Sequence, residues 1–389
     1  MTSVSKTRYK GQCAVIIMLF IACMVFPGTG RAEKEPYTIG AIFSVTGPAS
    51  WLGEPERNTA QMIADKVNGT GGINGHPLKL IVYDTEGDET KSVLNAKKLI
   101  ERDHVLAIIG PSRSGSSLAV IPVVEEAGVP NISCAASAKI TEPIKRWVFK
   151  VAQSDSFCAE KMFDYMLKKG ITKVAIITVS DGYGDSGRIE LQKAAKNMGI
   201  TIVADERYSN KDTDMTAQLT KIKGTDAQAI VNWSIGPTQV IITKNVHQLG
   251  FKIPLFQSSG FGSTKNIDQA GPAASGVLVP VGRILVADLL PEDHYQKKVL
   301  MEYKREYEER FGSEVSTFGG HAYDAMYILV EALKAVGPDR TKIRDYIENL
   351  QGFMGIADVY RFSPDDHCGL TKDAFEMLQV RNGSFALAE

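Results

Sequence analysis

The stretch that decides the fold is LAIIGPSRSGSSLAVIPVVEEAGVPNISCAAS, which runs from Leu106 to Ser137. Its apolar run 106–109 is short and is followed directly by Gly110-Pro111, a combination typical of a buried β-strand that ends in a turn. Apolar residues then recur at helical spacing as far as Gly128, which is expected to end the helix. A second apolar run, 129–133, completes a strand–helix–strand unit.

Small polar loops follow both strands of this unit. The first loop is 112–117 and the second is 134–137. In an open parallel sheet, ligands bind outside the carboxyl ends of the strands, and N–H groups and hydroxyls at a helix start suit an anion such as a carboxylate. We therefore interpret these loops as half of a ligand-binding cleft. The alternative, in which the serines only cap the helix, stays open because one serine can serve both purposes.

The same alternation of strands and helices runs through most of the chain. It predicts an α/β fold with two domains, each a doubly wound parallel sheet covered by helices on both faces. Segments 44–53 and 180–186 are expected to be loops, and 358–362 and 375–380 are expected to pair as a final hairpin. Strands are expected at 37–43, 78–84, 147–151, 174–179, 200–204, 229–233 and 255–258.

Length and composition agree with a globular protein of two domains. The chain has 389 residues, 44% of them hydrophobic and 23% charged, and its formal net charge is -1. Because the charge is balanced and no basic run occurs, a nucleic-acid partner is not expected.

Residues 1–32 have the features of a signal peptide. Lys6, Arg8 and Lys10 form a positive start, and the apolar run 13–26 is shorter than the span of about 20 residues that a membrane helix needs. Cleavage is expected after Ala32, which places the mature protein in an oxidising compartment outside the cytoplasm. An uncleaved anchor helix, or a lipoprotein modified at Cys23, stays open as an alternative.

No catalytic, cofactor or metal-binding motif stands out. The segment 110–117 nearly fits the phosphate-binding pattern G-x-x-x-x-G-K-S, but Ser116 stands in the place of the lysine. The six histidines are scattered without the spacing of metal ligands. After cleavage three cysteines are expected, Cys134, Cys158 and Cys368, which allow at most one disulfide. We therefore expect neither an enzyme nor a cofactor.

A set of short motifs gives the whole mature chain a family resemblance. In this order they resemble landmarks of the periplasmic solute-binding proteins of the branched-chain amino acid (Leu/Ile/Val-binding) type, which serve ABC transporters. The resemblance implies the periplasmic-binding-protein type I fold, in which two lobes joined by three crossovers close over one small molecule. It assigns 37–153 and 283–355 to an N-terminal lobe, and 154–282 and 356–389 to a C-terminal lobe. The motifs are Ser44–Pro48, Gly71–Gly75, Ile109–Pro111, Glu126–Pro130 and Asp212–Asp214.

The resemblance also implies site residues. Ser114 resembles the serine that holds the ligand carboxylate, and Ala135, Ala136 and Ser137 resemble the segment that gives it backbone contacts and a second hydroxyl. Tyr183 resembles the second-lobe aromatic residue that covers the ligand. Trp51 and Leu52 occupy the side-chain wall formed by the first loop. Ser234 and Ile235 fall near a second-lobe tyrosine that this chain does not match.

The resemblance is incomplete at the position that would bind an α-ammonium group. Ser259 falls where the amino acid binders have a glutamate, and Asp181 is the one nearby acid that might replace it. When a closed cleft removes an ammonium group from water, the free-energy cost of desolvation is not compensated unless a charged partner is present. The sequence therefore favours a small carboxylate ligand, an aromatic acid or similar, captured for an ABC transporter permease in the inner membrane by a monomeric binding protein. A branched-chain or other hydrophobic amino acid, or a sensory ligand-binding domain on the same fold, stays open as an alternative.

Overall fold

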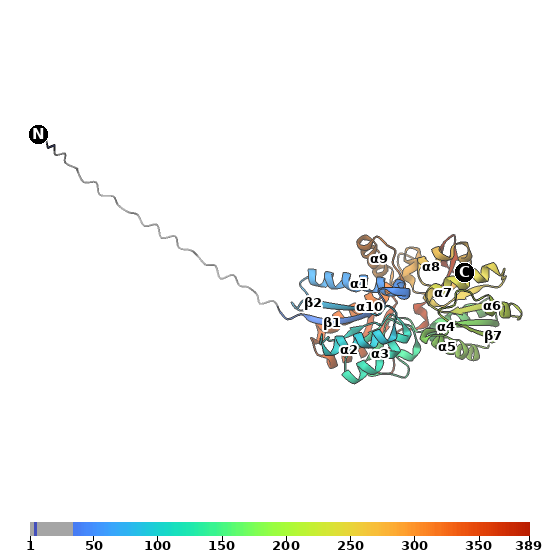
Figure 1. Cartoon of the computed structure of the whole chain (residues 1–389), viewed down its shortest axis with the longest axis horizontal. Helices are drawn as coiled ribbons and strands as arrows, with labels where there is room; N and C mark the ends of the chain where they lie inside the picture. The colour runs from blue at the N-terminus through green and yellow to red at the C-terminus, as the bar shows by residue number, and fades with distance from the viewer. Residues whose placement is uncertain (1–3, 6–33) are drawn as a thin grey trace. The chain divides into compact units, whose positions relative to one another are not determined.

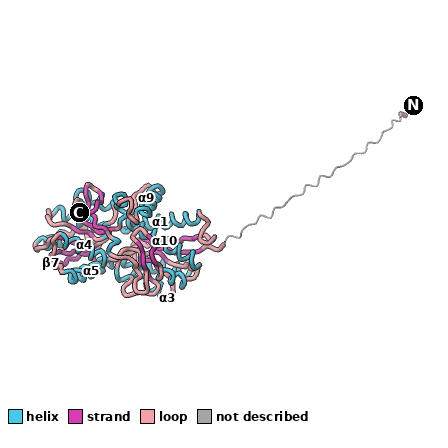
Figure 2. The backbone as a smooth tube through the Cα atoms, turned by 180° about the vertical axis from the view of Figure 1, so that it is seen from behind, coloured by secondary structure: helices cyan, strands magenta, loops and turns pink. Residues whose placement is uncertain are grey.

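The computed structural model describes residues 4–5 and 34–389, so the predicted signal peptide and its cleavage site lie outside the described residues. Lys34–Glu389 form one compact unit with two large β-sheets, each at the centre of one lobe, and a small sheet of two strands (Figure 1). Seen from behind, the strands gather in two groups with helices around them (Figure 2). Within the described part of the chain, no helix is both long and apolar enough to cross a membrane.

The first sheet is parallel throughout and has the strand order β2-β1-β3-β4-β5. Alternate residues of β1 point to opposite faces, as the period of a strand requires. Ile39 and Phe43 share a core with helices α1 and α10, whereas Ile42 shares a core with α2 and α3. The elements are β1 (Tyr37–Phe43), β2 (Leu78–Asp84), β3 (Ile108–Ile109), β4 (Asn131–Ser133) and β5 (Val148–Lys150), with α1 (Ser50–Gly69), α2 (Glu89–Glu101), α3 (Ser114–Ala127), α10 (Thr317–Val336) and α11 (Arg340–Glu348).

The second sheet has the strand order β14-β13-β10-β9-β8-β6-β7 and is parallel except at one edge, where β13 and β14 are antiparallel. Helices α4 and α5 cover one face, and α6, α7 and α8 cover the other. The elements are β6 (Lys173–Val179), β7 (Thr201–Tyr208), β8 (Ala229–Trp233), β9 (Leu255–Gln257), β10 (Leu278–Val281), β13 (Glu376–Arg381) and β14 (Ser384–Leu387), with α4 (Asp155–Lys168), α5 (Gly182–Met198), α6 (Thr216–Lys223), α7 (Pro237–Gln248) and α8 (Thr264–Ala270). The predicted fold class, two α/β lobes with doubly wound sheets, is confirmed.

The chain passes between the lobes three times: after β5, after β10, and before β13. The second passage leads through α9 (Lys297–Phe311) to α10. The third comes later than the sequence predicts, because Tyr360 and Phe362 belong to the core of the first lobe. Tyr360 Oη donates a hydrogen bond to the carbonyl of Val151 at 2.6 Å. We therefore propose that the third crossover lies at about residues 371–375 rather than at residue 355.

Several sequence-based expectations about local structure are wrong. Ser50 already lies in α1, and α5 begins at Gly182, inside a segment that is predicted to be a loop. The predicted final hairpin does not form. Instead β12 (Val359–Arg361) pairs with β11 (Gln351–Met354), and β13 pairs with β10 and β14. Tertiary contacts explain this difference. β12 packs into the core of the first lobe, whereas β13 extends the sheet of the second lobe.

Candidate functional site

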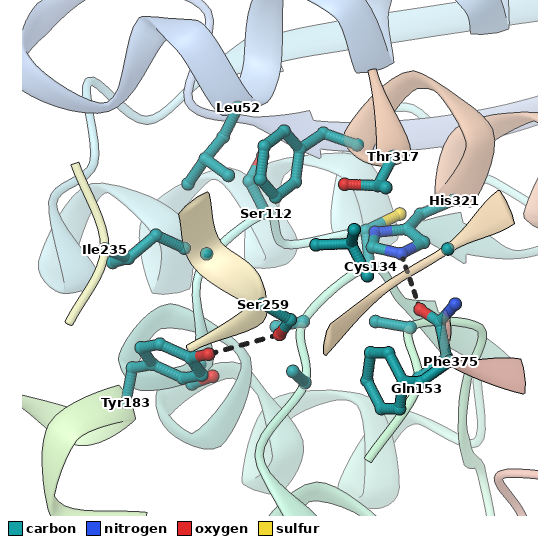
Figure 3. Close-up of a pocket in the computed structure, with 18 residues that line it drawn as sticks. Leu52, Ser112, Cys134, Gln153, Tyr183, Ile235, Ser259, Thr317, His321 and Phe375 are labelled. Atoms are coloured by element: carbon teal, nitrogen blue, oxygen red, sulfur yellow. Dashed lines mark hydrogen bonds between the residues drawn. The ribbon is translucent and has the colours of Figure 1, made fainter. Parts of the chain in front are cut away.

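A cavity with about 470 Å³ of empty space, part of it open to solvent, lies between the two lobes (Figure 3). The loops after β3 and β4 contribute the first part of its wall, and the loops of the second lobe contribute the facing part. The crossovers and the first turns of α10 complete it. The lining residues are Leu52, Ser112, Ser114, Cys134, Ala135, Ala136, Ala152, Gln153, Tyr183, Ile235, Ser259, Gly260, Val281, Gly282, Thr317, Phe318, His321 and Phe375.

The predicted carboxylate-binding loops meet in this wall. Ser114 is the first residue of α3, and Ala135 and Ala136 follow β4, so the parallel strands bring them to the same sheet edge. Ser114 Oγ accepts a hydrogen bond from the N–H of Ser137 at 3.3 Å. Ser137 itself does not line the cavity, because its hydroxyl donates to Ser186 Oγ across the lobes at 2.7 Å.

The second lobe contributes Tyr183, Ile235 and Ser259. Tyr183 Oη lies 3.4 Å from Ser259 Oγ, and Figure 3 shows the two side chains pointing toward each other. Burial raises the pKa of Tyr183. The phenol therefore stays neutral and can donate or accept one hydrogen bond.

Besides Ser137, three predicted site residues lie outside this cavity. Asp181 Oδ2 pairs with Arg113 Nη2 at 3.0 Å, and its Oδ1 accepts from the N–H groups of Tyr183 and Gly184. Trp51 packs edge-on against Phe318, with ring centroids 5.0 Å apart, and together with Asp181 lines a neighbouring hollow at the entrance. Ser234 is fully buried and accepts a hydrogen bond from Asn232.

Sequence reasoning misses the residues that the crossovers and α10 contribute, notably Gln153, Thr317, Phe318 and His321. Three of these residues belong to α10, which begins at Thr317 after the cap Ser316. That cap is the signal available in the sequence, because a serine before an apolar run marks a helix start. His321 Nε2 lies 3.3 Å from Gln153 Oε1, and burial lowers the pKa of His321 to about 4.

Among the described residues that line the cavity there is no aspartate or glutamate. The acid behind it is Glu56, which is fully buried and hydrogen-bonded to Ser112. Burial raises the pKa of Glu56 well above its usual value, an effect that the hydrogen bond from Ser112 only partly opposes. Glu56 is therefore not a ready source of negative charge for a ligand.

The cysteines and potential metal ligands do not form a further centre in the described part of the chain. Cys134, Cys158 and Cys368 are free and buried. Among residues 4–5 and 34–389, no cluster of three or more His, Cys, Asp or Glu side chains could hold a metal ion.

Residues 36–384, almost all of the described chain, match the family described as periplasmic binding protein. The chain belongs to this family. The match spans both lobes and the cavity between them, and it agrees with the family resemblance that the sequence motifs indicate.

Solved structures of other members are closely similar. An extracellular ligand-binding receptor from Rhodopseudomonas palustris HaA2 is 28% identical, with a TM-score of 0.85 over 91% of this chain and 100% of that one. The branched-chain amino acid transporter substrate-binding protein LivJ from Streptococcus pneumoniae, solved with isoleucine, is 26% identical, with a TM-score of 0.80 over 91% and 99%. A Leu/Ile/Val-binding protein of Rhizobium johnstonii, BraC3, is 28% identical over 66% of this chain and 70% of its own.

Proposed function

We propose that this periplasmic binding protein captures a small, largely apolar amino acid between its lobes and delivers it to the permease of an ABC importer. The observation that carries the proposal is the cavity between the lobes, with Ser114 and the start of α3 on one side and Tyr183 on the other. Relatives whose names record branched-chain amino acid binding support the ligand class.

The carboxylate of such a ligand has suitable partners in the first lobe. The Ser114 hydroxyl and the N–H group of Ala136, in the loop after β4, are neutral donors beside a helix N-terminus, where a negative charge is favoured. Apolar side chains, Leu52, Ile235 and Phe318, supply a surface for the body of the ligand. A site with a few polar groups in an apolar wall is typical of small-molecule pockets.

A second candidate ligand is an aromatic or other carboxylic acid without an amino group. The observation that favours it is the absence of any carboxylate from the cavity wall, since Ser259 and Tyr183 offer only neutral oxygens to an ammonium group. Asp181, the acid that might have replaced the missing glutamate, is engaged by Arg113 outside the cavity.

Thermal unfolding in the presence of each ligand distinguishes the candidates. We would compare leucine, isoleucine, valine and phenylalanine with benzoate and 3-phenylpropanoate. A ligand at a hundred times its Kd stabilises the folded state by about 2.7 kcal/mol, which raises Tm. Stabilisation by the amino acids is the expected result. Stabilisation by the aromatic acids alone would replace the first candidate with the second, and no response to any acid would contradict both.

Transport requires a second test. Deleting the gene in the source organism should abolish high-affinity uptake of whichever ligand binds. Unchanged uptake would contradict the importer part of the proposal.

A further inference from the structure

Lys150, the last residue of β5, is a lysine whose ammonium group is bound to the loop that is proposed to hold the ligand carboxylate. Its side chain is fully buried, which is rare for lysine because desolvation of an ammonium group costs free energy. Nζ donates to the carbonyl of Ala136 at 3.1 Å, to that of Ser137 at 3.2 Å and to Ser154 Oγ at 3.0 Å. All three protons of the ammonium group are therefore bound by neutral oxygens.

A single peptide group, that between Ala136 and Ser137, connects this ammonium group to the carboxylate site. Its carbonyl accepts from Lys150 Nζ and also from the N–H of Asp155 at 3.0 Å. Because a peptide bond is planar, a carbonyl held in this way also fixes the direction of the N–H of Ser137. That N–H donates to Ser114 Oγ at 3.3 Å.

This last hydrogen bond determines how the Ser114 hydroxyl can act on a ligand. Its oxygen accepts the N–H of Ser137, and the hydroxyl carries one proton of its own to donate. In a chain of hydrogen bonds each bond polarises the next, and a charged donor at the start makes the chain stronger. The positive charge of Lys150 therefore makes the Ser114 hydroxyl a better donor.

A bound carboxylate needs such support, because the cavity offers it no cation directly. Among the described residues that line the cavity there is no lysine or arginine. A carboxylate bound there depends on neutral donors, and a cation that strengthens these donors from outside the cavity compensates part of its desolvation.

We propose that Lys150 is a positioning residue for the ligand carboxylate, which acts through the peptide between Ala136 and Ser137 on the hydroxyl of Ser114. The ammonium group fixes the peptide, the peptide N–H fixes Ser114 Oγ, and the proton of Ser114 is thereby directed at the carboxylate. The proposal rests on the function proposed above and deepens it.

A double-mutant cycle between Lys150 and Ser114 tests this proposal. The probe is whichever of leucine, isoleucine, valine, phenylalanine, benzoate and 3-phenylpropanoate raises Tm most, and calorimetry on the purified protein measures its Kd. All six carry a carboxylate, so the test does not depend on the ligand class. Lys150→Met keeps the length of the side chain without its charge and should raise Kd roughly 10-fold. In the Ser114→Ala background the same substitution should raise Kd by less than about twofold, because the hydroxyl is already lost.

Two controls separate positioning from a merely structural role. Leu52 lines the cavity but takes no part in this chain of hydrogen bonds, so Lys150→Met should still raise Kd roughly 10-fold in the Leu52→Val background. Asp324 is a buried acid of α10 that accepts from the N–H groups of Ile356 and Ala357. Asp324→Asn should therefore lower Tm while its Kd stays that of the wild type. If Lys150→Met does not fold, Lys150→Gln, which keeps a donor without the charge, takes its place in the cycle and should show a smaller effect of the same kind.

The possible outcomes separate this inference from the proposed function. If the effects of the substitutions at Lys150 and Ser114 simply add, Lys150 does not act through Ser114 and the inference is wrong. If the Lys150 variant binds the probe like the wild type, the inference is wrong and the proposed function stands. If none of the six acids binds the wild type, the proposed function fails and this inference fails with it.

Discussion

Arg113 and Asp181 join the two lobes by an ion pair of 3.0 Å that lies outside the proposed ligand cavity. Arg113 immediately precedes α3 and Asp181 caps α5, so the pair connects two helices that meet at their N-terminal ends. Arg113 also donates to the carbonyl of Gly87 at 3.0 Å, which fixes the guanidinium on the first lobe. We infer that contacts outside the cavity contribute to the stability of the closed arrangement.

The first prediction concerns this ion pair. Asp181→Asn removes the charge but keeps a good capping residue, because asparagine caps helices about as well as aspartate. Both side chains are only partly exposed, 26% for Arg113 and 13% for Asp181. Loss of the pair should destabilise the closed state by about 1 kcal/mol and speed ligand release roughly fivefold, measured by stopped-flow fluorescence.

Arg113→Gln is the matched variant. The double variant should destabilise the closed state little more than either single substitution does, because both substitutions remove the same interaction. If each variant releases ligand at the wild-type rate, or if their effects simply add, the pair does not hold the lobes together.

The second prediction concerns the contact between Gly182 and Gly115, beside the ion pair. A Cβ atom on Gly182 would lie 2.8 Å from the Cα atom of Gly115, which belongs to the other lobe. Because the obstacle is backbone, Gly182→Ala should hold the lobes apart without disturbing either fold. Ligand affinity should fall at least tenfold while the Tm of the ligand-free protein changes little. Solution scattering should show a smaller decrease in radius of gyration on ligand addition.

Gly69→Ala is the control for this prediction. Gly69 is also helical, and no heavy atom lies within 4 Å of a Cβ atom added there. It should bind ligand like the wild type. Equal affinity of Gly182→Ala and Gly69→Ala would show that the lobes need not approach as closely as they do in this structure.

The strands and the helix ends of the fold could be predicted from the sequence because their signals are local. The apolar run Ala229–Trp233 is a strand with the predicted bounds. Gly128 and Gly199 end their helices in the left-handed conformation, with φ of 61° and 72°. Strand pairing is not a local signal, which explains why the predicted final hairpin is wrong.

The same distinction applies to the candidate site. Ser114 and Ala135 could be predicted to lie together because loops at the carboxyl ends of neighbouring parallel strands converge, whereas Tyr183, on the other lobe, is predicted only by the family resemblance. Gln153, His321 and Phe375 come from the crossovers and from a helix late in the chain, and no local pattern shows that these segments meet. The sequence pattern is sufficient to predict Asp181 as a helix cap. Its ion pair with Arg113 depends on how the lobes approach each other and cannot be predicted in this way.

The third prediction concerns Ser114. A hydrogen bond from its hydroxyl to a ligand carboxylate is a bond to a charged group, so Ser114→Ala should cost about 1.5–3 kcal/mol, or roughly 10- to 100-fold in Kd. Ser137→Ala should have a smaller effect, since its hydroxyl bonds Ser186 and does not line the cavity. Calorimetry measures both affinities, and thermal unfolding checks that both variants fold. An equal or larger loss of affinity in Ser137→Ala would contradict the assignment of the carboxylate to Ser114.

The fourth prediction concerns Asp324, a buried acid of α10 that binds the segment 356–360, which follows β11. Its carboxyl oxygens accept hydrogen bonds from the N–H groups of Ile356 and Ala357, at 2.5 and 2.9 Å, and Oδ2 lies 2.9 Å from Tyr360 Oη, whose proton is directed at the carbonyl of Val151. An asparagine side chain would direct an NH₂ group at one of these donors. Asp324→Asn should therefore lower the free energy of unfolding by about 1–3 kcal/mol.

The same residue makes stability depend on pH in a defined direction. Burial raises the pKa of Asp324 to about 7, whereas an unfolded aspartate titrates near 3.9. Between these values the folded protein binds a proton that the unfolded chain has released, so the contribution of Asp324 to stability is lost as pH rises toward 7. His321, whose pKa is lowered to about 4, acts in the opposite direction, because its contribution to stability is lost as pH falls from about 6.5 toward 4.

A comparison of wild type with Asp324→Asn isolates the effect of Asp324. Since His321 is present in both proteins, its effect cancels. Urea unfolding should therefore show the advantage of the wild type over the variant shrinking by roughly 2 kcal/mol between pH 5 and pH 7. An advantage that is constant over this range would show that Asp324 is already ionised at pH 5, and that the hydrogen bonds it accepts outweigh its burial.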